Sequence, residues 1–405
     1  MAIGQGINKR YAYKKQSAKG TPASGGSGQL LRRETAMSKL TKDTYSSNEI
    51  NSHQQYVGDK HGIAKSTGAH NGLMSAGTYS VLLGSLCRKD QLATTAISGA
   101  SITIAGAGPT FTLTRGSGSY LTDGVKIGDV VRITAGTYTG IARDINLLVT
   151  AVTATVLTVI VPNGKTLAAQ GPIASSTITV MGKKTWVPTT GHTDDYYTFE
   201  EWFSDISKSH TFSDIKISKC DIALPPTGNA SLNLSMIGLG VRTKGGAQVL
   251  TSPTAETTSQ ILTSVCGAVL IGGTQYTIVT SMNITIDGQI THGEAVLGSN
   301  FITDANKGDV KVTGSFTVLY QDDVISDMLD NETPTSLNVL VTDSRNDNAD
   351  FMCFVMSRVK LFSDDVDDGK KQLVRTYNFT AEINGNGGVA LADLQTIISI
   401  QDSLA

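Results

Sequence analysis

Cysteines, aromatic residues and long apolar runs are all scarce in this sequence, and each shortage excludes a class of protein. Only four of the 405 residues are cysteines, and 6% are aromatic. No C-x-x-C spacing occurs, so we expect small core residues in a reducing compartment rather than disulfide partners or metal ligands. The cysteines are Cys87, Cys220, Cys266 and Cys353.

No stretch of the sequence predicts a membrane helix or a secretory signal. Residues 145–161 are apolar and uncharged, but four threonines and Asn146 interrupt them, which favours paired strands over a membrane helix. Residues 1–10 lack the apolar segment of a signal peptide. We therefore expect no association with a membrane.

The overall charge is nearly balanced, which argues against a dedicated nucleic-acid binder. The formal net charge is -2 and the pI is about 6.3, whereas such binders usually have a basic patch and a much higher pI. The charge is nevertheless uneven. Residues 1–90 contain 13 Lys or Arg and 5 Asp or Glu, and residues 301–405 contain 8 and 17. Two interpretations remain open: ordinary solvated surface, or a basic end of one subunit that docks on an acidic end of another.

Patterns typical of catalytic or metal sites are also missing. His53, His61 and His70 fall neither on one helix face nor in a recognised ligand spacing. No serine lies in a G-x-S-x-G motif, and no glycine-rich loop is followed by the Lys-Ser/Thr pair of a phosphate site. The acidic run at 364–369 fails as a calcium loop because Val366 stands where an oxygen ligand is needed. The sequence therefore predicts no enzyme, metal or cofactor.

The sequence is rich in glycine and in threonine that alternates with apolar residues, and one motif occurs in it twice. Abundant glycine with threonine-rich alternation favours a mainly β protein with short turns. The motif G-x-x-K-x-T-G recurs, and a duplicated unit usually builds symmetry or a continuous surface. Its positions are Gly62, Lys65, Thr67 and Gly68 in the first copy and Gly308, Lys311, Thr313 and Gly314 in the second.

Each copy of the motif is followed by a segment with helical periodicity. The apolar positions are Tyr79, Leu82, Leu83 and Leu86 in the first copy and Ile325, Met328 and Leu329 in the second. This spacing predicts a short helix that covers a sheet. Further along, strands that begin at Ser218 and Ser357 are predicted to correspond, and an acidic hairpin turn is predicted at 364–369.

The first copy contains a long insertion. The stretch from Gly68 to Ser218 is more than three times as long as that from Gly314 to Ser357, and residues 94–180 are dominated by Thr, Ala, Gly, Ser and Val. Strands are predicted over 128–134 and 148–161, the second as a hairpin near 153–155. We expect a first repeat unit at 1–90 and 190–245, an inserted all-β domain at 91–189, and a second unit at 246–405.

Several short stretches near the N-terminus occur in an order typical of one family. They are SAKGTP at 17–22, LRR at 31–33, KDTY at 42–45, SNEI at 47–50, the motif at 62–68 and GTY at 77–79. In this order they resemble the N-terminal part of bacteriophage tail tube proteins, and the duplication extends the resemblance more weakly through 190–405. The resemblance implies two tandem units of β-sandwich or barrel type, each flanked by a short α-helix. The inserted all-β module would then be a decoration domain.

The same resemblance implies a structural role in a virion tail. Such proteins assemble into stacked rings that form a hollow tube, the conduit for DNA ejection. Two units in one chain favour three chains per ring. The implied partners are other copies of the chain, the tape measure protein, the tail terminator, distal tail or baseplate proteins, and DNA as passing cargo held without specificity. Assembly would take place in the cytoplasm of the host bacterium.

Contact residues between rings are also predicted from the resemblance. Residues 45–60 are a candidate stacking loop, with a counterpart near 288–307. Surface ion pairs contribute only about 0–1 kcal/mol each, so they would set register rather than hold the tube together. The candidates are Tyr45, Asn48 and Glu49 in the loop, the basic Lys9, Arg10, Lys14 and Lys15, and the acidic Asp364, Asp365, Asp367 and Asp368.

Two other functions remain open from the sequence. The tube of a contractile injection or secretion machine shares the fold but delivers protein. A β-rich surface-binding protein could use the inserted module to recognise carbohydrate or a receptor. Stacking on sugar rings usually requires Trp or Tyr, and between residues 91 and 180 only Tyr120 and Tyr138 qualify, which weighs against a carbohydrate site.

Overall fold

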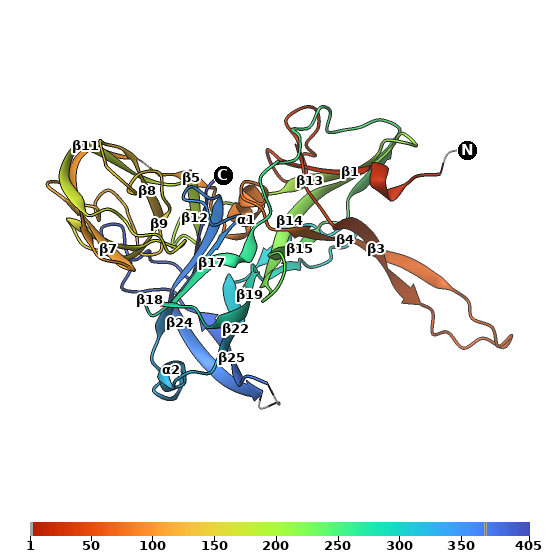
Figure 1. The fold of residues 1–405 in the computed structure, drawn as a ribbon. Helices are drawn as coiled ribbons and strands as arrows, with labels where there is room; N and C mark the ends of the chain where they lie inside the picture. Colours follow the sequence, from red (N-terminus) through yellow and green to blue (C-terminus); the bar gives the residue numbers. More distant parts are fainter. Residues whose placement is uncertain (1–2, 95, 368, 370) are drawn as a thin grey trace.

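The chain is built almost entirely of antiparallel strands. A computed structural model describes residues 3–94, 96–367, 369 and 371–405. Half of the chain lies in strands and 4% in helices, which confirms the mainly β prediction. The strands form one large sheet, a closed barrel and a two-stranded sheet (Figure 1).

The first repeat unit contributes one end of the large sheet. In this sheet β3 pairs with β4, β4 with β15, β15 with β14, β14 with β13, and β13 with β1. Their bounds are β1 (Lys9–Lys15), β3 (Thr35–Ser46), β4 (Asp59–Leu73), β13 (Tyr197–Phe203), β14 (Lys208–Leu224) and β15 (Ser231–Gly238). Around them lie η1 (Gly6–Asn8), β2 (Gln29–Leu30) and β16 (Arg242–Gly245).

The second repeat unit has the same order of strand pairs. Here β19 pairs with β22, β22 with β25, β25 with β24, β24 with β23, and β23 with β17. The bounds are β17 (Thr263–Ile271), β19 (Val279–Asp287), β22 (Lys311–Leu319), β23 (Thr335–Thr342), β24 (Phe351–Asp367) and β25 (Val374–Ala381). The unit also contains β18 (Thr274–Tyr276), β20 (Ile290–His292), β21 (Ala305–Lys307) and β26 (Ser399–Asp402).

Strand register shows which residues of β14 and β24 are equivalent. Ile215 of β14 pairs with the last residue of β15, and Val359 of β24 pairs with the last residue of β25. A bulge follows at Ser218 in the first strand and at Phe362 in the second. The predicted match of Ser218 with Ser357 is therefore five residues out of register. The predicted acidic turn is also wrong in part, because β24 runs on through Asp367.

The two units share one sheet and one core. The C-terminal half of β14 pairs with β15 on one side and with β19 of the second unit on the other. Side chains from β14, β15, β19, β22, β24 and β25 all enter the same buried cluster. Burial of this apolar surface joins the units into one body.

The two predicted helices are present, one buried and one at the edge. In α1 (Ser80–Leu86), Leu82, Leu83 and Leu86 are fully buried, whereas Val81 faces solvent. The helix packs on β14 (Figure 1). In α2 (Val324–Asp330), Ile325 is buried, and Met328 and Leu329 pack against the core at its edge.

The inserted segment forms a closed six-stranded barrel. Its strand order is β10-β7-β6-β11-β8-β9, and the predicted hairpin appears as β9 and β10 with the turn at 153–155. The bounds are β6 (Ile97–Gly106), β7 (Thr110–Arg115), β8 (Val130–Ala135), β9 (Leu147–Val152), β10 (Val156–Ile160) and β11 (Gln170–Val180). The alternating apolar residues fill a separate core inside the barrel.

The barrel packs against the second unit through buried contacts. Apolar residues of β8, β9 and β10 join residues of β17, β23 and β24 in one cluster. Beside it, Lys184 forms a buried ion pair with Asp129. Lys126 Nζ donates to the carbonyl oxygens of Gly388 and Val389, at 2.8 and 2.7 Å. The chain leaves and rejoins the large sheet through β5 (Leu92–Ala93) and β12 (Lys183–Trp186), which pair with each other.

Candidate assembly surfaces

The seam between the two units shows how one unit binds the next. Across it, β14 and β19 pair antiparallel from Lys219 opposite Asp287 to Leu224 opposite Met282. Ile222 and Ile284 face the core and are almost fully buried. On the other face of the sheet, Thr285 Oγ1 donates to Asp221 Oδ1 at 2.6 Å.

The sheet that contains this seam has two free edges. Its strands run in the order β3, β4, β15, β14, β19, β22, β25 and the C-terminal part of β24. Within the described residues, β3 pairs with no strand other than β4, and residues 363–367 of β24 pair only with β25. On the β3 edge, the Ser38 N–H donates to Glu201 Oε1 at 3.0 Å and the Ala36 carbonyl oxygen accepts from Lys9 Nζ, so side chains cover part of this edge. Unpaired edges present backbone N–H and C=O groups to another chain.

Exposed apolar side chains mark both edges. Met37 on β3 is 62% exposed, and Val366 on β24 is 51% exposed. Ile222, which stands in β14 where Val366 stands in β24, is only 1% exposed because β19 lies beside it. The difference shows that the end of β24 lacks a neighbour that β14 has.

The basic candidates near the N-terminus mostly have partners within the chain. Lys9 Nζ donates to Glu201 Oε1 and to the carbonyl oxygen of Ala36, both at 2.7 Å. Lys14 Nζ donates to the carbonyl oxygens of Ser24 and Gly26 at 2.8 and 2.6 Å, so it closes the glycine-rich loop.

Lys15 and Arg10 differ in their surroundings. Lys15 Nζ lies 3.0 Å from carboxylate oxygens of both Asp90 and Asp195. Arg10 is exposed on β1 and has no ion pair among the described residues. Among the residues that the structure describes, none of the four basic candidates pairs with Asp364, Asp365 or Asp367, so their role between rings stays a prediction.

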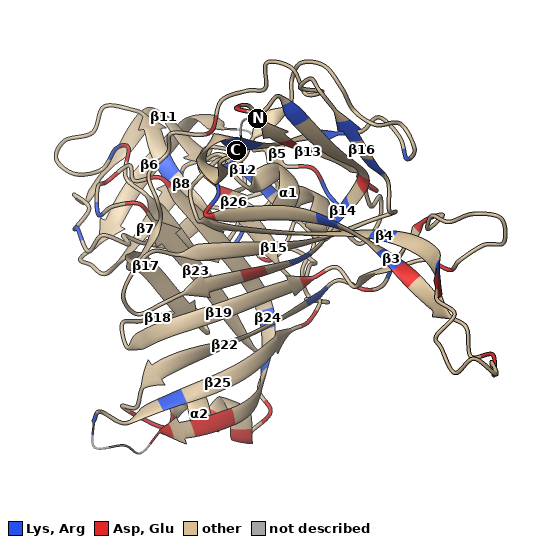
Figure 2. Ribbon diagram, turned by 90° about the vertical axis from the view of Figure 1, so that its right-hand side faces the viewer, with Lys and Arg blue, Asp and Glu red and all other residues tan. Residues whose placement is uncertain are grey.

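The acidic candidates lie at the opposite end of the sheet. Asp364 accepts a hydrogen bond from Arg375, whose guanidinium lies over the Tyr320 ring. Asp365 and Asp367 are exposed on β24, and Asp368 lies outside the described residues. Figure 2 shows further acidic residues on the neighbouring α2, so this end of the molecule is acidic.

The candidate stacking loop is the tip of a long hairpin. The β3–β4 hairpin projects away from the rest of the chain (Figures 1 and 2). Tyr45 lies at the end of β3, and Asn48 and Glu49 are exposed beyond it. Large apolar side chains of the tip also face solvent: Ile50 is 103%, Tyr56 66% and Val57 55% exposed.

The counterpart of this loop in the second unit folds back on the first. The amide of Ala64 in β4 donates to the carbonyl oxygen of Asn300 at 2.7 Å. Ile302 and Ala305 join a small apolar cluster with Tyr196 and Leu239. The two equivalent loops therefore differ, because the second one lies against the first unit, although its own tip at 294–298 is exposed.

The glycines of the duplicated motif lie where backbone or rings approach closely. A Cβ on Gly62 would lie 2.6 Å from the Tyr45 ring, and one on Gly68 3.0 Å from Met236. A Cβ on Gly314 would clash with the Asn283 carbonyl oxygen, and one on Gly308 would contact Gln289 at 3.0 Å. The other motif positions, Lys65, Thr67, Lys311 and Thr313, lie on the face of the sheet away from the core.

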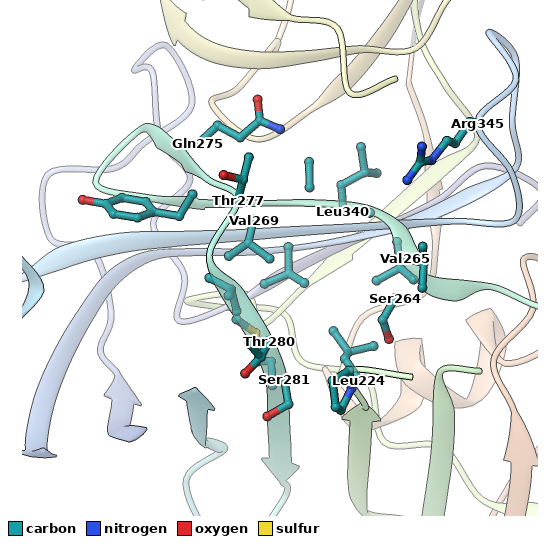
Figure 3. A pocket seen from close by; sticks show the side chains of 18 residues that line it. Leu224, Ser264, Val265, Val269, Gln275, Thr277, Thr280, Ser281, Leu340 and Arg345 are labelled. Atoms are coloured by element: carbon teal, nitrogen blue, oxygen red, sulfur yellow. The ribbon is translucent and has the colours of Figure 1, made fainter. Parts of the chain in front are cut away.

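A groove in the second unit does not contain a catalytic arrangement. It has a volume of about 480 Å³ and lies among β17, β18, β19 and β23. Val265, Val269 and Leu340 line it, with Arg345 at one side (Figure 3). It brings no nucleophile together with a base. In the part of the chain that the structure describes, no group of three metal-ligating side chains occurs, and no helix is long and apolar enough to cross a membrane.

The barrel surface gives no support to the carbohydrate-binding alternative. Tyr120 is fully buried, with the Arg115 guanidinium over its ring. Tyr138 is half-buried, and its hydroxyl lies 2.7 Å from Ser176 Oγ. Neither ring is free to form a platform for a sugar.

The sequence prediction misses the β3 edge, and it names Asp364, Asp365 and Asp367 as turn residues without recognising that they lie on a free strand edge. Met37, Lys39 and Val366 become candidates only when strand pairing shows which edges are free. One local signal was present, since Val366 is an apolar residue inside an acidic run.

Comparison with known proteins gives one family. The family model described as phage tail tube protein matches residues 6–389. No curated protein matches the chain.

Proposed function

Since the chain belongs to the phage tail tube protein family, we propose that three copies close into a ring and that stacked rings form the DNA channel of the tail. The observation that carries this proposal is the sheet with two free edges, one on each repeat unit. A sheet edge left open invites uncontrolled aggregation, whereas ring closure pairs every edge by symmetry. Two units per chain favour three chains, which gives six similar units around the channel.

The solvent-facing side of the sheet suits a channel lining. Threonine, asparagine and serine dominate it, and two of its lysines pair with aspartates. Lys65 lies 2.9 Å from Asp43, and Lys219 lies 2.9 Å from Asp221. Paired lysines attract phosphate weakly, so DNA would pass without being held.

Stacking is assigned to the hairpin tip at 47–58. Burial of its exposed apolar side chains against the next ring would supply the binding energy, and the flanking Tyr45, Asn48 and Glu49 would contribute polar contacts. The exposed Arg10 would add register between rings, whereas the exposed Asp365 and Asp367 lie on the free edge of β24 that faces the next copy within a ring. Lys9, Lys14 and Lys15 would have to exchange their present partners to take part.

The proposed domain boundaries follow the sequence prediction. Residues 91–189 form a module on the outside of the tube, and the units at 1–90 with 190–245 and at 246–405 form its wall. Within the virion tail, the tube would contact the tape measure protein, the tail terminator and distal tail or baseplate proteins. Assembly would occur in the bacterial cytoplasm before the tail joins the virion.

Electron microscopy of the purified protein tests this proposal. The protein is concentrated at moderate salt, and rings or tubes are averaged in projection down their axis. Hollow tubes with threefold symmetry and six inner lobes would support it. Discrete monomers at every concentration and salt, or rings with another symmetry, would contradict it.

A further inference from the structure

We infer that residues 363–367 of β24 in one copy pair antiparallel with residues 37–41 of β3 in the next copy, in the register used inside the chain by β14 and β19. This inference rests on the proposed ring, because it names the joint that closes it. It assigns each residue of the joint a partner.

The first step is the equivalence of β3 with β19. Each is the antiparallel neighbour of a strand that contains the duplicated motif. Lys65 of the first motif pairs with Thr41, and Lys311 of the second pairs with Asp287. Thr41 therefore occupies in β3 the place that Asp287 occupies in β19.

The second step is the equivalence of β24 with β14. Lys219 pairs with Ser235 after the bulge in β14, and Ser363 pairs with Asn378 after the bulge in β24. Ser235 and Asn378 themselves pair with equivalent positions, Ala69 and Ser315. Ser363 therefore occupies the place of Lys219.

The third step transfers the register of the internal seam. Lys219 lies opposite Asp287 across that seam, so Ser363 lies opposite Thr41 of the next copy. The pairs are Ser363 with Thr41, Asp364 with Leu40, Asp365 with Lys39, Val366 with Ser38, and Asp367 with Met37.

The chemistry of the transferred pairs is complementary. Asp365 takes the place of Asp221, and Lys39 takes the place of Thr285, so the internal hydrogen bond becomes an ion pair between copies. Both side chains are exposed in the single chain, so they are available for this contact.

The apolar residues gain burial in the same register. Val366 takes the place of Ile222 on the core-facing side of the sheet. On the partner strand, Ala36 and Leu40 face that side and already pack against the core. Pairing would cover Val366 as β19 covers Ile222, and the Ser38 N–H would exchange Glu201 Oε1 for a carbonyl oxygen of β24.

Paired cysteines test the register. In antiparallel strands, successive opposite pairs alternate between hydrogen-bonded and non-hydrogen-bonded geometry, and the latter places the Cα atoms about 4.5 Å apart. Two variants, M37C/D367C and S38C/V366C, therefore sample both geometries. A third, M37C/D365C, is two residues out of register, with a separation of about 7–8 Å that disfavours a disulfide.

Full-length variants are oxidised, separated without reductant and imaged in parallel. We expect at least one in-register variant to give covalent dimers and trimers, while M37C/D365C and the wild type stay monomeric on the gel. Rings without in-register crosslinks, or with crosslinks in M37C/D365C, would overturn the register and leave the proposed function standing. Absence of rings and of crosslinks in all variants would overturn both.

Charge reversal gives a second readout. K39D and D365K each place like charges opposite each other, and we expect each to reduce the fraction of protein in rings several-fold at low salt. K39D/D365K restores opposite charges and should recover the wild-type fraction. Equal loss in the double variant would count against the assigned pair, and K42D, on the same strand but outside the pairing, is the matched control.

Discussion

At the scale of single residues, one buried histidine of the first unit makes the stability of the chain depend on pH. His70 is fully buried in β4, with its ring stacked on Tyr11 at a centroid distance of 6.1 Å and tilted against Tyr79 at 5.7 Å. Burial opposes the charged form and lowers the pKa of His70 to about 4. The folded chain therefore holds this imidazole neutral.

This burial predicts a loss of stability in mild acid. The unfolded chain binds a proton below its ordinary pKa of about 6.5, whereas the folded chain does so only near pH 4, so stability falls between these values. The contribution lost is about 3 kcal/mol by pH 4. H70F keeps the ring stack and should flatten that part of the profile, measured by urea unfolding at several pH values.

The control for this experiment is H53Q, at an exposed histidine of the hairpin tip. It should retain the wild-type loss of stability. An H70F protein with an unchanged pH profile would show that another group causes the loss.

The glycines of the duplicated motif predict a steric effect. G314A adds a Cβ that contacts the Asn283 carbonyl oxygen and lies 2.6 Å from the Phe379 ring. Overpacking of this kind costs about 1–3 kcal/mol, to be measured as a shift of the urea midpoint. G246A, where no atom lies within 4 Å of the added Cβ, should change stability little. Equal effects of the two variants would refute the steric explanation.

At the scale of elements, the hairpin tip can be removed without breaking strand pairing. Ser46 and Asp59 are opposite each other at the end of the β3–β4 ladder. Replacement of residues 47–58 by Asn-Gly, a two-residue turn that suits hairpins, should preserve rings and abolish stacking. Electron microscopy would then show single rings at concentrations where the wild type forms tubes.

A second variant keeps the length of the hairpin tip and changes only its apolar side chains. I50S/Y56S/V57S keeps the hairpin length and removes its exposed apolar surface. We expect the same loss of stacking. Tubes of normal length from either variant would show that stacking depends on residues outside the hairpin tip.

A buried ion pair lies where the barrel packs against the second unit. K184M leaves Asp129 buried without its partner, which typically costs about 3–5 kcal/mol. K184M/D129N removes both charges and should cost less, because no unpaired charge remains buried. Urea unfolding measures the difference in free energy of unfolding. Equal losses in the two variants would mean that an unpaired buried charge is not what destabilises K184M.

How much the sequence predicts also depends on scale. The helices and the β9–β10 hairpin follow from local periodicity, because Leu82, Leu83 and Leu86 fall on one face and Thr153 begins a turn. The match of β14 with β24 cannot be read locally, because only their pairing with β15 and β25 sets the register, and the alternation within each strand does not. The partners of Lys9 and Lys15 lie far away in the sequence, so no local pattern indicates that these lysines are already paired.

At the scale of the whole molecule, the inserted barrel is more than an appendage. Its shared apolar cluster with β17, β23 and β24 means that the second unit lacks a complete surface without it. Excision of residues 94–182, with a short glycine linker between β5 and β12, should therefore expose Leu270, Leu340 and Phe351. We expect aggregation on expression, measured by the soluble fraction after centrifugation.

A second version of this deletion also replaces the apolar residues that the barrel covers on the second unit. The excised chain with L270S/L340T/F351T carries a polar surface in place of the apolar one and should regain solubility. A fully soluble chain without these substitutions would show that the barrel only decorates the tube.

The covalent link between β14 and β19 also affects the kinetics of assembly. Every second joint of the proposed ring is already closed when a chain folds, so only three of the six joints have to form between molecules. The translational and rotational entropy of association is then lost by three bodies instead of six. Ring concentration should accordingly rise with the third power of free chain concentration. Over a given range of expression levels, such a tube would begin to form at a lower and less sharply defined threshold than one built from separate single units.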